Sequence, residues 1–267
     1  MSDKPVVLAV GAHPDDIEFM MAGTLLLLGK AGWKLHYMNI GNGSCGTATQ
    51  PREAIVTARR EEAKEACKLA GAEWHAPQCN DIEIVHSTEM ARKVGAIVRK
   101  VRPRIMLIPS PQDYMEDHVN AGRLAVTAAF TRTMMNFPSD PPLPPVTDAV
   151  TLYHALPYGL RGPLRERIRP GQFVDVSSVM KEKTAMLACH RSQKEWLDQS
   201  QGVGSYLAVM EVFAGEVGRM SGRFEFAEGW RRRSHLGFCG PADDPLSEAL
   251  ETGCFVDPAY EAGLEKG

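Results

Sequence analysis

The chain has 267 residues, of which 44% are hydrophobic and 24% are charged, and its formal net charge is -3. These values are typical of a soluble globular protein with one α/β domain of ordinary size. The sequence pI near 6.3 gives no reason to expect a nucleic-acid partner, and no apolar run approaches the roughly 20 residues that span a bilayer. Without a secretory signal or a regular cysteine framework, we expect free thiols and a cytoplasmic location.

Short apolar runs alternate with helical patterns in the first half of the chain. Strands are predicted at residues 6–10, 35–40, 73–75 and 105–108, and helices at 17–31, 52–70, 88–101 and 118–135. Gly71 follows the second helix as a stop signal. This order predicts an α/β fold: a doubly wound, Rossmann-like, mostly parallel sheet flanked by helices, with strand order 3-2-1-4-5.

The second half of the chain gives weaker signals. The proline-rich stretch 137–145 is predicted to be a surface connection. A strand is expected at residues 149–155 and helices at 180–191 and 206–220. We expect an α/β domain over residues 1–225 and a C-terminal extension over residues 226–267 that packs on it or is partly irregular.

Polar side chains follow the first strand directly, in Ala12-His13-Pro14-Asp15-Asp16. The carboxyl ends of the strands are where open α/β sheets bind their ligands. Since strands 1 and 4 are neighbours in the expected order, the loop with Asp117 and His118 should reach the same crevice. Two imidazoles and one carboxylate, with an open position for water, are typical of a catalytic zinc site.

The residues around this cluster also allow other interpretations. Asp15, adjacent to the metal ligands, is free to act as a general base on the water. Asp16 could instead be the N-cap of the following helix. Arg59 could be a solvated charge on an exposed helix face.

The motif Ala12-His13-Pro14-Asp15-Asp16 after the first strand resembles the signature of the PIG-L/LmbE-like N-deacetylases. These are zinc-dependent amidohydrolases that remove acetyl groups from N-acetylglucosamine-type substrates. Further matches in chain order are Asn42-Gly43-x-x-Gly46, Arg59-x-x-Glu62-Ala63, Asp117-His118 and His190-x-Ser192-Gln193. The resemblance covers residues 5 to about 195, and the tail after about residue 225 has no counterpart.

The resemblance implies a set of site residues and a reaction. Its metal ligands are His13, Asp16 and His118, holding one Zn²⁺ per chain or another divalent transition metal, and its catalytic residues are Asp15 and Asp117. The resemblance implies that Arg59, Asp81 and His190 bind the substrate, and we further expect Tyr114 and the turn residue Gly43 to lie at the substrate pocket. The implied partner is a small N-acetylated sugar or glycoconjugate. The implied assembly is a homo-oligomer, a trimer or a hexamer.

One position departs from the family pattern. The family element begins with a histidine three residues before the ligand His118, and this chain has Met115 there. A thioether cannot donate a hydrogen bond to an oxyanion, so we expect a replacement donor such as Tyr114 or His190. Two alternatives stay open: a family-like protein that binds a sugar without turnover, and a nucleotide-binding enzyme that uses Gly41-x-Gly43-x-x-Gly46.

Overall fold

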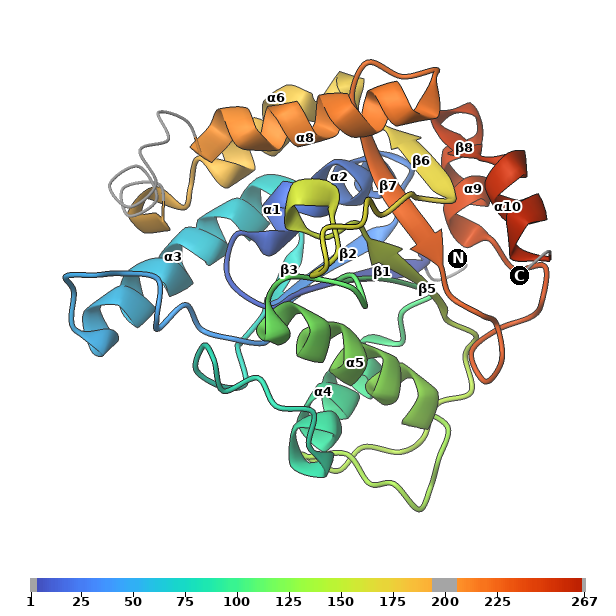
Figure 1. Ribbon diagram of the computed structural model, residues 1–267. Coiled ribbons are helices and arrows are strands. Elements are labelled where there is room, and N and C mark those ends of the chain that lie inside the picture. Colours follow the sequence, from blue (N-terminus) through green and yellow to red (C-terminus); the bar gives the residue numbers. More distant parts are fainter. Residues whose placement is uncertain (1–3, 194–205, 266–267) are drawn as a thin grey trace.

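The computed structural model describes residues 4–193 and 206–265, which are organised around one sheet of eight strands (Figure 1). The strands are β1 (Val6–Gly11), β2 (Lys34–Asn39), β3 (Glu73–His75), β4 (Ile105–Ile108), β5 (Thr151–Ala155), β6 (Gln172–Asp175), β7 (Ala227–Arg232) and β8 (Cys254–Val256). Their order is β3-β2-β1-β4-β5-β7-β6-β8. The first five are parallel, which confirms the predicted doubly wound arrangement, and the last three are antiparallel.

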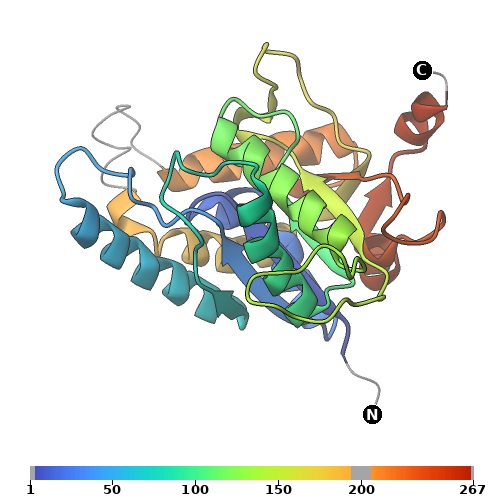
Figure 2. The ribbon, with the colours of Figure 1, turned by 90° about the horizontal axis from the view of Figure 1, so that it is seen from below.

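Helices cover both faces of the sheet (Figures 1 and 2). One face carries α1 (Asp16–Met20), α2 (Ala22–Lys30), α3 (Arg52–Ala70), α6 (Met180–Leu187) and α8 (Tyr206–Ser221), and the other carries α4 (Thr88–Val101) and α5 (Glu116–Thr131). Because side chains alternate along a strand, Val7 and Ala9 pack in the first layer while Leu8 and Val10 pack in the second. The β1 run is therefore apolar throughout, as expected for a parallel strand buried on both faces.

The single helix expected over residues 17–31 is two helices that break at Met21, whose φ is -135°. The break leaves the first N–H groups of α2 free to donate hydrogen bonds to a buried side chain of β7. Glu228 accepts hydrogen bonds from the backbone N–H of Gly23 and Thr24, both at 2.8 Å. Lys183 from α6 pairs with the same carboxylate at 2.6 Å, so the charge at this helix start is compensated.

The tail after residue 225 continues the sheet rather than lying outside it. Its strand β7 lies between β5 and β6, and Trp230 on this strand is fully buried. The helices α9 (Pro245–Leu250) and α10 (Pro258–Leu264) accompany β8 at the far edge (Figure 1). Among the described helices, none has the length and apolar character needed to cross a membrane.

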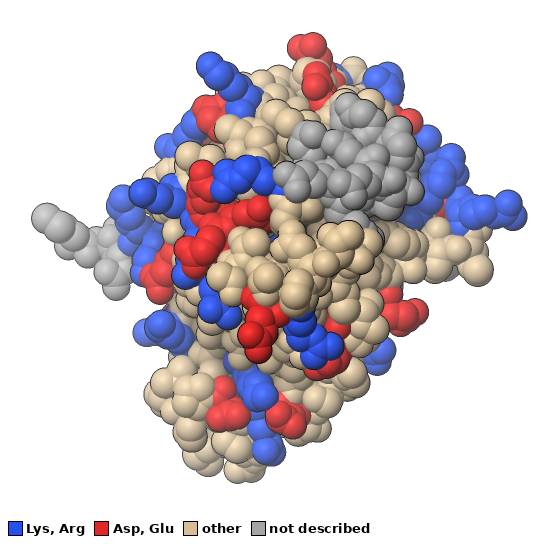
Figure 3. Space-filling view, turned by 90° about the vertical axis from the view of Figure 1, so that its left-hand side faces the viewer, with Lys and Arg blue, Asp and Glu red and all other residues tan. Residues whose placement is uncertain are grey.

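Charges of both signs are interspersed on the face shown in Figure 3, which is the left-hand side of Figure 1. Over its described residues, this face therefore carries no extended field of one sign of the kind that attracts a polyanion.

Candidate active site

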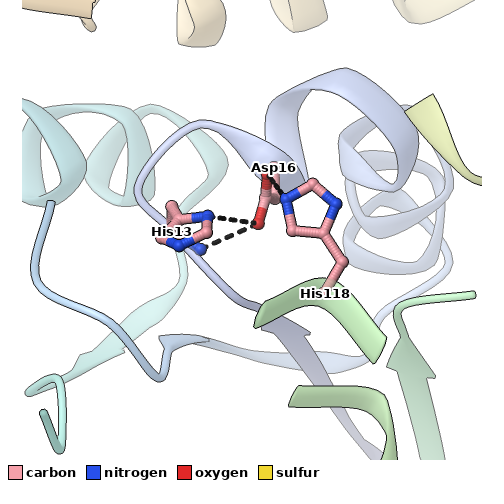
Figure 4. A group of neighbouring side chains, drawn as sticks. All are labelled: His13, Asp16 and His118. Carbon is pink, nitrogen blue, oxygen red and sulfur yellow. Dashed lines mark hydrogen bonds and ion pairs between the residues drawn. The ribbon is translucent and has the colours of Figure 1, made fainter. Parts of the chain in front are cut away.

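Three predicted metal ligands converge from two loops at the carboxyl ends of β1 and β4 (Figure 4). His13 and Asp16 follow β1, and His118 lies in the first turn of α5, beyond the neighbouring strand β4. One ligand atom from each residue lies within 4.8 Å of the other two. Asp16 lies between the rings, since its Oδ2 is 3.8 Å from His13 Nδ1 and its Oδ1 is 3.4 Å from His118 Nε2.

A further carboxylate holds the outer nitrogen of each imidazole. His13 Nε2 lies 2.8 Å from Asp117 Oδ2, and His118 Nδ1 lies 3.0 Å from Asp113 Oδ1. A carboxylate that accepts the outer N–H of a histidine fixes its tautomer and leaves the inner nitrogen free to bind a metal. Both inner nitrogens are the ones that point toward Asp16.

Asp16 is held as a carboxylate by its surroundings. Its Oδ2 accepts hydrogen bonds from the backbone N–H of Ala12 at 2.9 Å and of His13 at 2.8 Å. Burial alone would raise the pKa of Asp16, but the imidazoles of His118 and His13 hold it well below its usual range. Two imidazole nitrogens and one ionised carboxylate, each oriented by its own partners, fit a divalent transition metal with an open position.

Asp15 adopts a strained backbone conformation beside the three ligands. Its φ is 108°, in a region that residues other than glycine rarely occupy and that marks functional sites. Asp15 Oδ2 accepts a hydrogen bond from the Tyr206 hydroxyl at 2.6 Å and lies 3.5 Å from Arg59 Nη2. Burial raises the pKa of Asp15, and the charge of Asp16 adds to this effect, while Arg59 opposes it.

A cavity of about 220 Å³ opens at these residues. Its lining includes seven of the predicted site residues: His13, Asp15, Asp16, Arg59, Asp81, Tyr114 and His118. It also includes residues to which the sequence analysis gave no role in binding: Phe19, Cys45, Gly46, Ile82, Met115, Tyr158, Gln193 and Tyr206. Within the described ranges, the lining does not include the predicted Asp117, Gly43 and His190.

These three residues lie outside the cavity lining and contact other residues near it. Asp117 contacts His13, as described, and also accepts the backbone N–H of Ile82 at 2.6 Å. Gly43 donates its N–H to Asp81 Oδ1 at 2.7 Å. His190 is fully buried, and its Nε2 lies 3.4 Å from Glu18 Oε2. Asp117 thus contacts the site through the predicted ligand His13, and His190 faces the buried carboxylate of Glu18.

The glycine turn after β2 makes room for Arg59. A Cβ on Gly43, whose φ is +83°, would lie 2.5 Å from the Arg59 side chain, and a Cβ on Gly46 would lie 2.3 Å from it. Arg59 is only 3% exposed, and its guanidinium donates to the carbonyl of Pro14. Arg59 is therefore a buried cavity residue, and the interpretation as a solvated surface charge is wrong.

The same geometry argues against a dinucleotide site at these glycines. In the dinucleotide motif the glycine turn opens a helix directly and approaches the pyrophosphate. Here α3 begins only at Arg52, after Pro51 as its N-cap. The space that a phosphate would need beside Gly43 and Gly46 is taken by Arg59.

The hydrogen bond between Tyr206 and Asp15 could not be predicted from the sequence. Tyr206 lies 191 positions after Asp15, at the start of α8, and donates the hydrogen bond described above. A tyrosine at the start of a helix carries no local sign of such a role, because the contact exists only once α8 has packed over α1.

The chain is similar to proteins of known activity. Residues 8–129 match the family described as PIG-L: GlcNAc-PI de-N-acetylase. The chain is 29% identical over 240 residues to a diacetylchitobiose deacetylase of Thermococcus kodakarensis, covering 86% of this chain and 84% of the relative. It is 26% identical over 195 residues to a 4-oxalmesaconate hydratase of Pseudomonas putida, covering 70% and 73% respectively.

A solved structure shows the same fold. The N,N'-diacetylchitobiose deacetylase of Pyrococcus horikoshii matches with a TM-score of 0.74 at 24% identity, over 88% of this chain and 85% of that one. At this identity the likeness concerns the fold alone. Together with the family match, it agrees with the resemblance expected from the motif after β1.

Proposed function

We propose that this chain, whose residues 8–129 match the PIG-L family, is a metal-dependent N-deacetylase. Its substrate class would be N-acetylglucosamine-type sugars or their conjugates. The proposal depends above all on one observation: His13, Asp16 and His118 converge at a cavity that Asp15 also lines. The similarity to a diacetylchitobiose deacetylase supports the same substrate class.

His13, Asp16 and His118 would hold the metal ion, and Asp117 and Asp113 would orient the two imidazoles. A zinc ion bound there would lower the pKa of its water toward about 7 and polarise the acetamide carbonyl. The chain's own contribution is to direct these three groups at one point through the hydrogen bonds described above.

Asp15 is the proposed general base. Tyr206 and Arg59 both contact its Oδ2, which leaves Oδ1 to take a proton from the attacking water. The protonated Asp15 then returns the proton to the departing amine as the C–N bond breaks. The products are acetate and the free amine of the sugar.

Tyr114 is the proposed replacement for the missing oxyanion donor at Met115. It lines the cavity, and its ring centroid lies 5.8 Å from that of His118. Burial raises the pKa of Tyr114, so its hydroxyl keeps the proton that it would donate to the oxyanion. His190, the other candidate, is fully buried against Glu18.

The remaining cavity residues would bind the sugar. Asp81 accepts the N–H groups of Gly43 at 2.7 Å and Cys45 at 3.0 Å, so its carboxylate is fixed in place and can still accept from a hydroxyl through its other lone pairs. The guanidinium of Arg59 can donate to vicinal oxygens in a fixed fork. The rings of Tyr114 and Tyr158 offer an apolar surface for a sugar face, with centroids 6.1 Å apart.

A hydratase activity is the second candidate, because the chain also resembles a 4-oxalmesaconate hydratase. That substrate name denotes a polycarboxylate. Among the described residues that line the cavity, the carboxylates of Asp15, Asp16 and Asp81 occur together with one guanidinium, that of Arg59. The chain matches the hydratase with lower identity and coverage than the diacetylchitobiose deacetylase, so the deacetylase remains the first candidate.

The deciding experiment measures acetate release from N-acetylglucosamine and its β-linked oligosaccharides by the metal-loaded protein. We expect acetate and primary amine in equal amounts, and a loss of both in Asp15→Asn while the metal content stays unchanged. Bound metal without acetate release from any N-acetylated sugar would contradict the deacetylase assignment. Hydration of an unsaturated polycarboxylate by the same sample would then favour the second candidate.

A further inference from the structure

A second group of metal-binding side chains lies on the β2–β3 edge of the sheet, outside the active site. His36 on β2 is paired in register with Glu73 on β3, and Met38 is paired with His75. Since side chains alternate along each strand, His36, Glu73 and His75 share one face. A nitrogen from each histidine and a carboxylate oxygen of Glu73 lie within 4.8 Å of one another.

The nitrogen atoms of the two histidines converge closely. His36 Nδ1 lies 2.8 Å from His75 Nε2 and 3.9 Å from Glu73 Oε2. The two rings are stacked, with centroids 5.1 Å apart and an interplanar angle of 21°. Both histidines are buried while Glu73 is exposed. The imidazoles are therefore enclosed by the fold, and the carboxylate is open to solvent.

The electrostatic surroundings favour the neutral imidazole of both histidines, which is the form that binds a metal. Burial lowers the pKa of His36 to about 4, with His75, Lys34 and Lys100 acting in the same direction and Glu73 opposing them. Burial also lowers the pKa of His75, which the charge of Glu73 opposes and those of Lys100 and Lys34 assist. Both imidazoles are therefore neutral at pH 7, as a ligand must be.

Among the described residues, Lys34 would compete with a metal ion for the Glu73 carboxylate. Its Nζ lies 3.5 Å from Glu73 Oε2, and both side chains are about half exposed. An exposed pair of this kind contributes little, on the order of 0–1 kcal/mol. A divalent ion held by two imidazoles can displace it.

We propose that His36, Glu73 and His75 form a second metal site, which binds a divalent transition metal such as Zn²⁺ and ties the edge strand β3 to β2. Two imidazoles and one carboxylate, with solvent in the fourth position, form a common donor set for this ion. The strand β3 has only three residues and lies at the sheet edge. A metal bridge across the strands would stabilise it by binding only the folded state.

The experiment counts zinc per chain by equilibrium dialysis and elemental analysis, using the full-length protein. We expect two equivalents in the wild type, one in His75→Gln and one in Asp16→Asn. The exposed Glu73→Gln change removes one ligand without opening the core, and it should weaken the second equivalent at least tenfold. His86→Gln, at an exposed histidine on a loop, is the matched control and should leave two equivalents.

A second readout separates this site from the active site. In the Asp16→Asn background, added Zn²⁺ should raise the melting temperature in proportion to the logarithm of its concentration. Adding His75→Gln or Glu73→Gln should weaken or abolish that rise. A single equivalent in the wild type, or an unchanged second equivalent in Glu73→Gln, would overturn the proposal. The deacetylase assignment is unaffected either way, because His75→Gln leaves the catalytic group intact.

Discussion

Asp117 Oδ2 lies 2.8 Å from His13 Nε2, and this contact orients the proposed metal ligand His13 without adding a further one. The same oxygen accepts the N–H of Ile82 at 2.6 Å, in a residue with a φ of +65°. Asp117 therefore connects the loop after β3 to His13, the proposed metal ligand on the loop after β1. This double role makes Asp117 a positioning residue.

Replacing Asp117 with Asn should weaken metal binding by roughly 10- to 100-fold, because the carboxylate that orients His13 is lost. Competition with a chelator of known zinc affinity measures this change. Asp113→Asn, which disturbs His118 in the same way, is the matched comparison and should show a loss of similar size. Metal affinity equal to that of the wild type in both variants would contradict the orienting role.

Asp15→Asn should lower kcat by at least roughly 100-fold while zinc content stays at the wild-type level, because a general base is lost and no ligand is. Turnover with an N-acetylated sugar and elemental analysis of the same preparation test this together. If the variant hydrolyses at the parent rate, Asp15 is not the base.

Tyr206→Phe should shift the acidic limb of the kcat/KM profile to higher pH. The Tyr206 hydroxyl donates to Asp15 Oδ2 at 2.6 Å, and this bond lowers the pKa of Asp15 against the larger effect of burial. Without it the pKa of Asp15 rises further, so a higher pH is needed to keep the base ionised. Tyr158→Phe, at a tyrosine that also lines the cavity, serves as the control and should leave the limb in place.

Tyr114→Phe should lower kcat by roughly 100-fold with little change in KM, because an oxyanion donor acts on the transition state. A steady-state comparison with Tyr158→Phe measures this effect. Full turnover in Tyr114→Phe would assign the oxyanion to another group.

Acid should destabilise the fold partly through His154 on β5, whose pKa is lowered by burial to about 4. Its Nδ1 lies 2.8 Å from the Pro109 carbonyl. The unfolded state takes up a proton near pH 6.5 and the folded state only near pH 4, so stability falls as the pH decreases between these values. The decrease in the free energy of unfolding that is due to His154 approaches about 3 kcal/mol.

Urea unfolding of the wild type and His154→Gln at pH 7 and pH 4.5 measures this contribution. The difference in stability between the two proteins should shrink or reverse at the lower pH. A difference that is independent of pH would show that His154 is not the group responsible.

The buried pair of Lys183 and Glu228 gives a stability prediction. Lys183→Met leaves the Glu228 carboxylate buried without its cation, 2.6 Å from where Nζ lay, and should cost about 3–5 kcal/mol. Lys30→Met, which breaks the exposed pair with Glu182, is the control and should cost no more than about 1 kcal/mol. Urea denaturation compares the two, and equal costs would contradict the argument.

Several features of this protein followed from the sequence because their signals are local. The apolar runs of β1 and β4 and the periodic pattern of α3 predicted the parallel half of the sheet and its order. That order placed His13 and Asp16 opposite His118, since the ends of neighbouring parallel strands meet at one edge. The motif after β1 is local too, and it predicted the resemblance to the family whose model matches residues 8–129.

Other features depend on contacts between distant segments, and only the tertiary structure decided them. The strand β7 contains Gly229 and two arginines and carries no clear alternation, yet it pairs with β5 and β6 in the interior of the sheet. The contact of Asp15 with Tyr206 depends on how α8 packs. Local periodicity reports which face of a segment is apolar, but the free energy that selects its partner comes from long-range packing, which no stretch of sequence contains by itself.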